Sequence, residues 1–234
     1  AERVLEAHAE STAGDHGRIT LAITNTVKEA RALHDALSKT LLGQDEAPDL
    51  RLVHSRFRGF EREQWREQFL GKEHCRPGAD RIVVATQVVE AGVDISATAL
   101  VSQLAPWPSL VQRFGRAARY GGTALVEVVD RDLSDKDARP YSKEELDAAR
   151  EALDGLNGVS LGELEGFEER LRKSQPEVLS ALYPYDPLHV LTPRDQEELF
   201  DTGPDLTGMD LDVSRFIRSG EVRDLQVFWR TIET

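Results

Sequence analysis

The sequence predicts an α/β fold in which a mostly parallel sheet is covered by helices on both faces. Across residues 17–130, short apolar runs alternate with segments whose apolar residues recur at helical spacing. The runs are continuously apolar, as in residues 81–85, which indicates strands buried on both faces. Strands that alternate with helices favour a parallel sheet, so residues 17–132 are expected to form one α/β lobe. Residues 1–16 are expected to form a preceding helix or a linker.

The expected elements follow one another regularly along this lobe. A helix over residues 27–41 follows the helix-capping residues Asn25 and Thr26. A second helix is expected around Trp65, and a third, rich in arginine, over residues 112–119. Strands are expected at residues 18–24, 50–54, 81–85, 99–104 and 123–129.

Polar side chains follow the expected strands at the points where the strands end. Ligand sites of parallel α/β sheets lie beyond the carboxyl ends of strands, so this edge is the expected binding site. Some of these residues also have a simpler structural interpretation. Asn25 or Thr26 can cap the next helix, and a histidine such as His54 often makes a structural hydrogen bond. The candidates are Thr24, Asn25, Thr26, His54, Ser55, Arg56, Thr86, Gln87 and Gln103.

Three arginines at spacings of three follow Gln112 in a segment that is poor in acidic residues: Arg113, Arg116 and Arg119. On a helix these arginines would share one face. Surface helices normally place Glu four residues from Arg, and that support is missing here. The pattern therefore predicts a surface that meets an anion, with a solvated basic face as the plainer alternative.

Residues 133–234 are expected to form a smaller, mixed but mainly helical accessory region. A helix over residues 141–155 begins with a capping box formed by Ser142 and Glu145. A second helix is expected over residues 162–174. The sequence does not determine the arrangement of the rest of this region.

The formal net charge of −13 is unevenly distributed along the chain. Residues 141–234 hold 10 basic and 21 acidic side chains, whereas residues 51–119 hold 11 basic and 7 acidic ones. The motif-bearing region is therefore locally basic and suited to a phosphate backbone, while the acidity belongs to the accessory region.

Composition predicts a cytoplasmic protein without a membrane segment. Hydrophobic residues make up 40% of the chain, and no apolar run approaches the roughly 20 residues of a membrane span. The Gly71-Lys72 pair does not fit the phosphate-binding loop of nucleotide-dependent motors, since Glu73 follows it. Cys75 and His74 supply too few ligands for a metal site, and none is expected.

Two stretches resemble motifs V and VI of superfamily 2 helicases. They are residues 85–96, Ala-Thr-Gln-Val-Val-Glu-Ala-Gly-Val-Asp-Ile-Ser, and residues 112–119, Gln-Arg-Phe-Gly-Arg-Ala-Ala-Arg. Residues 85–90 look most like the Cas3 helicases of CRISPR systems. The resemblance spans roughly residues 17–230 and implies the second RecA-like lobe of an ATP-driven single-stranded DNA translocase. Three further segments look like the tail of the type I-G (I-U) Cas3 branch: residues 199–208, 212–218 and 227–230.

The resemblance also implies roles for individual residues. Arg116 and Arg119 match arginine fingers, and Gln112 matches the residue that reaches the γ-phosphate or the attacking water. Gly92 and Asp94 match nucleotide-binding positions of motif V, with Asp94 directed to the ribose or to a finger. Arg113 is expected to serve structure or nucleic acid rather than ATP. The backbone of a single strand would contact Asn25, His54, Ser55, Arg56, Thr86 and Gln87.

The implied cofactor is ATP, with Mg²⁺ held by an absent first lobe, so the isolated lobe is expected to hydrolyse nothing. The implied partners are the first RecA-like lobe, an HD nuclease domain, single-stranded DNA and a Cascade-like CRISPR effector complex. Two alternatives remain open. One is the same lobe of another superfamily 2 helicase acting on RNA or DNA, and the other is a non-enzymatic scaffold domain.

Overall fold

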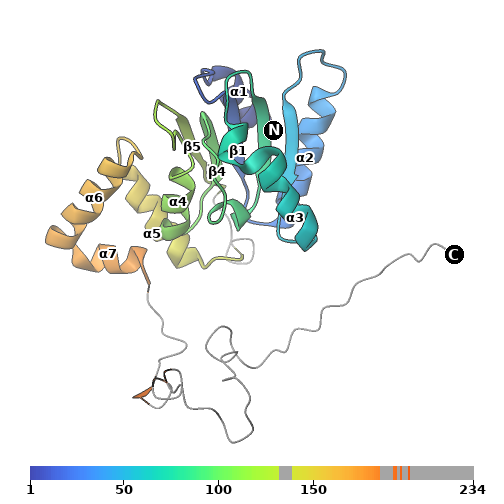
Figure 1. The fold of residues 1–234 in the computed structure, drawn as a ribbon. Helices are drawn as coiled ribbons and strands as arrows, with labels where there is room; N and C mark the ends of the chain where they lie inside the picture. The colour runs from blue at the N-terminus through green and yellow to red at the C-terminus, as the bar shows by residue number, and fades with distance from the viewer. Residues whose placement is uncertain (132–138, 185–191, 194–195, 197–199, 201–234) are drawn as a thin grey trace, which may run out of the picture. The chain divides into compact units, whose positions relative to one another are not determined.

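The computed structural model describes residues 1–131 and 139–184, together with Thr192, Pro193, Gln196 and Phe200. Its centre is a five-stranded sheet in the order β2-β3-β1-β4-β5, and every pair of neighbouring strands is parallel (Figure 1). The predicted fold class is therefore confirmed. The strands are β1 (Arg18–Ile23), β2 (Asp49–Val53), β3 (Asp80–Ala85), β4 (Ala99–Gln103) and β5 (Leu125–Val129).

Helices occupy most of the connections between these strands and continue beyond the sheet. Thr26 caps α2, because its side chain accepts a hydrogen bond from the Glu29 N–H, as the sequence predicts. The capping box of Ser142 and Glu145 at the start of α5 is also confirmed. The helices are α1 (Glu2–Glu10), α2 (Val27–Leu41), α3 (Gly59–Trp65), α4 (Trp107–Phe114), α5 (Lys143–Asp154), α6 (Leu161–Ser174) and α7 (Pro176–Leu182).

The sheet has a hydrophobic core on each face, which explains why its strands are continuously apolar. On one face, α1 and α2 bury Val4 and Leu37 against Ala22 of β1. On the other face, the alternate residues of the same strand, Leu21 and Ile23, belong to one hydrophobic cluster with buried residues of α4 and α5. Helix α1 is thus a packed part of the lobe.

The predicted helix over residues 112–119 is wrong in its extent, because α4 ends at Phe114. After Gly115 the chain pairs with Ala97: the Ala97 N–H donates to the Arg116 carbonyl over 2.8 Å, and the Ala118 N–H donates to the Ala97 carbonyl over 2.9 Å. These bonds replace helical ones, and Ala118 has a φ of 45°. Arg113, Arg116 and Arg119 therefore do not share one helical face.

The helices after residue 140 pack within the same compact unit as the sheet. This unit runs from Ala1 to Tyr185, and α5 lies beside α4 within it (Figure 1). Trp107 of α4 is buried and donates its indole N–H to Glu168 of α6 over 2.9 Å. The boundary predicted between residues 132 and 133 stays a prediction, and most of residues 185–234 lie outside the described residues. None of the helices in the described residues is both long enough and apolar enough to cross a membrane.

Candidate nucleic-acid and nucleotide site

The carboxyl ends of the central strands lie at one level of the sheet. Ile23 of β1 and Val53 of β2 are both in register with Ala85 of β3. The three segments that follow these strands are therefore neighbours at one edge, as the sequence predicts. We call this the strand-end edge, formed by residues 24–26, 54–56, 86–87 and 103.

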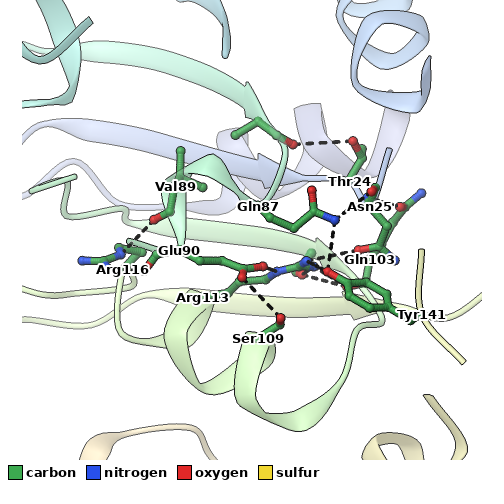
Figure 2. Close-up of polar contacts among 12 residues, drawn as sticks. Thr24, Asn25, Gln87, Val89, Glu90, Gln103, Ser109, Arg113, Arg116 and Tyr141 are labelled. Carbon is green, nitrogen blue, oxygen red and sulfur yellow. Dashed lines mark hydrogen bonds and ion pairs between the residues drawn. The ribbon is translucent and has the colours of Figure 1, made fainter. Parts of the chain in front are cut away.

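A fully buried guanidinium, that of Arg113, organises the strand-end edge (Figure 2). All five of its N–H groups have an acceptor, which matches the donor capacity of arginine. Its Nε donates to Glu90 over 2.8 Å, and both remaining nitrogens donate twice. Their acceptors are Ser102 Oγ (2.9 Å), the Gln103 carbonyl (3.0 Å), Asn25 Oδ1 (3.1 Å) and Tyr141 Oη (3.3 Å). The expectation that Arg113 serves structure agrees with this arrangement.

The side chains of Asn25 and Gln87 also belong to this network. Asn25 is 7% exposed, and its Nδ2 donates to the Leu104 carbonyl over 2.7 Å. Gln87 Nε2 donates to the Asn25 carbonyl over 2.8 Å and to Tyr141 Oη over 3.1 Å. Both amide nitrogens therefore hold the edge together, and of the two capping candidates it is Thr26 that caps α2.

The segment after β2 presents a different kind of surface, since Ser55 and Arg56 are exposed. His54 is 8% exposed, accepts a hydrogen bond at Nδ1 from the Arg56 N–H over 3.3 Å, and has its ring 4.4 Å from that of Phe57. Burial lowers the pKa of His54, and the charges of Arg31 and Arg56 lower it further.

Thr86 is almost completely buried, and its backbone N–H donates to the Val53 carbonyl over 3.2 Å. This bond joins the ends of β2 and β3, and the 3-10 turn η3 (Gln87–Val89) follows directly. Thr86 thus lies where the sequence predicts, between the exposed segment after β2 and the network around Arg113.

A second feature is a pocket of about 590 Å³ between the loop after η3 and the turn after α4. Gly92, Asp94, Arg116 and Arg119 line it together, as motifs V and VI predict. Lys72 also lines this pocket, and the sequence analysis had assigned it no role. We call this the arginine pocket.

The two arginines of the pocket are held differently. Arg116 donates to three backbone carbonyls, those of Val89 (3.1 Å), Val93 (3.1 Å) and Glu90 (2.5 Å), so it fixes the loop over residues 89–93. Arg119 is partly exposed and pairs with Asp94 over 3.0 Å. The pKa of Asp94 is lowered by the hydroxyl of Tyr120 and then by Arg119, which keeps Asp94 ionised.

Gln112 does not join this group. It is exposed on α4, and the described residues that line the arginine pocket do not include it. Within the part of the chain that the structure describes, no group of three or more His, Cys, Asp or Glu side chains is placed to hold a metal ion. The charged side chains that line the pocket are three basic ones, Lys72, Arg116 and Arg119, and three acidic ones, Glu67, Glu73 and Asp94.

Residues 16–122 match the family model described as "CRISPR-associated nuclease/helicase Cas3, C-terminal". The CRISPR-associated nuclease/helicase Cas3 of Streptococcus thermophilus is 37% identical over 109 residues, which cover 45% of this chain and 11% of that protein. The CRISPR-associated helicase Cas3 of Thermoproteus tenax is 29% identical over 160 residues, which cover 67% of this chain and 26% of that protein. The chain thus spans about a tenth to a quarter of these relatives.

Solved structures show the same likeness. T. fusca Cas3-ADP superposes with a TM-score of 0.57 at 26% identity, covering 72% of this chain and 22% of that one. T. fusca Cas3-ATP gives a TM-score of 0.56 at 26% identity over 72% of this chain and 23% of that one. The matched lobe is RecA-like, as the sequence analysis expects.

Proposed function

We propose that this chain is the C-terminal, second RecA-like lobe of a Cas3 helicase and one half of an ATP-driven single-stranded DNA translocase in CRISPR interference. The observation that supports this function is the arginine pocket, where motifs V and VI bring Gly92, Asp94, Arg116 and Arg119 together. The first RecA-like lobe would supply the other half of the ATP site. The HD nuclease domain and a Cascade-like effector complex are the further partners of this proposal.

The proposed ligand of the arginine pocket is the triphosphate of ATP. Bound ATP supplies a γ-phosphoryl group whose oxygens gain negative charge during transfer, and a guanidinium placed there is worth about 10³–10⁵ in rate. We assign that role to Arg119, because its ion pair with Asp94 is solvent-exposed and such pairs are worth only about 0–1 kcal/mol. Arg119 can therefore exchange its partner for phosphate.

Arg116 is the second finger position, and its proposed role is to hold the loop that faces the nucleotide. Its three donors already meet carbonyl groups of residues 89–93. Gly92 lies in that loop with a φ of 72°, so the backbone there can approach a nucleotide without a side chain intervening. Two further roles stay predictions: a contact between Gln112 and the γ-phosphate, and the binding of Mg²⁺ by the first lobe.

The single strand is proposed to cross the strand-end edge. Ser55 and Arg56 are the exposed contacts there, whereas Asn25 and Gln87 support the edge through the network around Arg113. This arrangement suits sugar and phosphate contacts, which carry no base sequence. His54 and Thr86, which are 8% and 2% exposed, stay predicted contacts of the strand.

The test is ATP turnover by the complete helicase that contains this lobe, measured with single-stranded DNA, with single-stranded RNA and without either. The variant Arg119→Ala is compared with Arg172→Ala, an exposed arginine of α6. DNA-stimulated turnover that disappears only in Arg119→Ala supports the proposal. Stimulation by RNA alone would assign the lobe to an RNA helicase, and no turnover with either polymer would favour the scaffold.

A further inference from the structure

The hydroxyl of Tyr141 reaches the strand-end edge from the segment that leads into α5 (Figure 2). It accepts one hydrogen bond from Arg113 over 3.3 Å and another from Gln87 Nε2 over 3.1 Å. Tyr141 lies beyond residues 16–122, which are the residues that match the Cas3 family model. The strand-end edge therefore has a contributor that the matched part of the chain does not contain.

Tyr141 and Asn25 together fix the side-chain amide of Gln87. The Asn25 carbonyl, a group that can only accept, takes one N–H of Gln87 Nε2 over 2.8 Å, and Tyr141 Oη takes the other. This contact identifies the nitrogen end of the amide, because an amide oxygen in its place would meet another oxygen. Both side-chain donors of Gln87 are thus used inside the protein.

The remaining polar atom of the Gln87 side chain is Oε1. None of the described residues donates a hydrogen bond to it. Gln87 is half-buried, and no side-chain oxygen in the described part of the chain is both buried and without a partner, so Oε1 reaches solvent. Gln87 thus offers an acceptor, and no donor, to a molecule that crosses the strand-end edge.

We propose that Tyr141 is a positioning residue for strand binding, which holds Gln87 so that its Oε1 accepts a hydrogen bond from a base of single-stranded DNA. Phosphate and deoxyribose inside a DNA strand carry no N–H or O–H group, whereas every unpaired base carries an N–H donor. The inference rests on the proposed function, because it assumes that a strand crosses the strand-end edge. It adds one base contact to the sugar and phosphate contacts proposed for Ser55 and Arg56.

The test is a double-mutant cycle on this chain, in which the affinity for a fluorescein-labelled oligo-dT is measured by anisotropy. Tyr141→Phe removes only the hydroxyl, and Gln87→Ala removes the amide that the hydroxyl holds. We expect each variant to bind about fivefold more weakly, the size of one ordinary hydrogen bond, and the double variant to bind no more weakly than Gln87→Ala. The matched control is Tyr183→Phe, which removes a hydroxyl that donates to Glu168 over 2.6 Å, and its affinity should equal that of the wild type.

The cycle separates positioning from a general loss of stability. Tyr141→Phe also takes one acceptor from the buried Arg113, so its melting temperature should fall. A purely structural effect of that kind would weaken binding by the same factor with and without Gln87, and that result would overturn the positioning role. Unchanged binding in Tyr141→Phe would overturn it as well.

A second oligonucleotide tests the base contact. An abasic oligodeoxynucleotide of the same length keeps the phosphates but lacks the base N–H donors, so Gln87→Ala and Tyr141→Phe should bind it as the wild type does. An equal loss of affinity for both oligonucleotides would put the Gln87 contact on the backbone and overturn the base assignment, while the proposed function stands. If the wild-type chain binds neither oligonucleotide at low salt, strand binding by this lobe fails, and with it both the proposed function and this inference.

Discussion

Arg113 Nε donates to Glu90 Oε1 over 2.8 Å, and the arginine side chain is completely buried (Figure 2). Glu90 follows η3, and its carbonyl also accepts a hydrogen bond from Arg116. One residue therefore joins the network of the strand-end edge to the loop of the arginine pocket. The strand-end edge and the arginine pocket share this connection, so the loss of the Glu90 side chain should affect the folding of both.

The first prediction concerns this buried pair. Glu90→Ala leaves the Arg113 charge buried without a carboxylate, and breaking a buried pair by removing one partner costs about 3–5 kcal/mol. Glu90 is only 13% exposed, so water cannot replace the lost carboxylate effectively. The free energy of unfolding from urea titration should fall by about 3 kcal/mol.

The control is Glu169→Ala, which removes an exposed pair with Lys173 on α6. Pairs of this kind at helical spacing contribute about 0.3–0.5 kcal/mol. The stability loss of Glu90→Ala should therefore be several times that of Glu169→Ala. Equal losses of stability in the two variants would mean that the other four acceptors of Arg113 are sufficient to stabilise its buried guanidinium.

The second prediction separates the two arginines of the arginine pocket. Arg119→Ala removes an exposed side chain, so the melting temperature should stay unchanged while ATP turnover of the complete helicase falls about 10³-fold. Arg116→Ala leaves three backbone carbonyls without their donor, and it should cost about 2 kcal/mol of stability as well as turnover. Both quantities can be measured on the same two variants.

If the melting temperature of Arg116→Ala equals that of the wild type, the predicted contrast between the two arginines is wrong. In that case Arg116 would be free to act as a finger, and its contacts with the loop over residues 89–93 would be unimportant. Strand binding should survive in both variants, because neither arginine lies on the strand-end edge. Loss of binding with turnover preserved would overturn the assignment of the pocket.

The elements that the sequence predicts correctly are those set by local patterns. The strands follow from continuous apolar runs, and the starts of α2 and α5 follow from Thr26 and Ser142 as caps. The gathering of residues 24–26, 54–56 and 86–87 at one edge follows from the topology of a parallel sheet. The pair of Asp94 with Arg119 agrees with what the resemblance to motifs V and VI implies. What these features share is that residues near in sequence, or a general rule of topology, determine them.

The features that the sequence analysis missed depend on contacts between distant residues. Residues after Gly115 look helical, but their backbone bonds with Ala97 end α4 early. The arginine-rich segment looks unneutralised, yet Glu90 pairs with Arg113 from 23 residues away. Tyr141, predicted only as the start of a helix, contributes a hydroxyl to the strand-end edge. No local pattern contains these partners.

The third prediction is a loss of stability in mild acid caused by His8. This residue of α1 is 5% exposed, with Nδ1 2.8 Å from Thr20 Oγ1 and Nε2 2.9 Å from Asp80 Oδ1. Burial lowers the pKa of His8, more than the charge of Asp80 raises it. The folded protein therefore binds the His8 proton only at a lower pH than the unfolded chain does.

The sign follows from this difference in proton binding. The unfolded chain protonates His8 below about pH 6.5, while the folded chain does not, so stability falls as the pH drops from about 6.5 toward the lowered pKa. Asp80, whose pKa is lowered chiefly by its hydrogen bond from Arg18, adds a separate loss only near pH 4 and below. Urea titrations between pH 7.5 and 5 should show the fall in wild type and a flatter profile in His8→Gln. The free energies of unfolding at pH 7.5 give the cost of the His8→Gln substitution itself. Parallel pH profiles of wild type and variant would exclude His8 as the cause of the fall in stability.

The fourth prediction tests the loop that Arg116 holds. Gly92 has a φ of 72°, in a region where a side chain costs about 1–2 kcal/mol, so Gly92→Ala should shift the loop that lines the arginine pocket. Gly43→Ala is the matched control, because Gly43 has a φ of 80° with open space around its Cβ position and lies after α2, away from the pocket. Both variants should lose similar stability, but only Gly92→Ala should raise the KM for ATP of the complete helicase, by about tenfold if the shift removes roughly 1.4 kcal/mol of binding. An unchanged KM in Gly92→Ala would mean that the backbone of this loop does not approach the nucleotide.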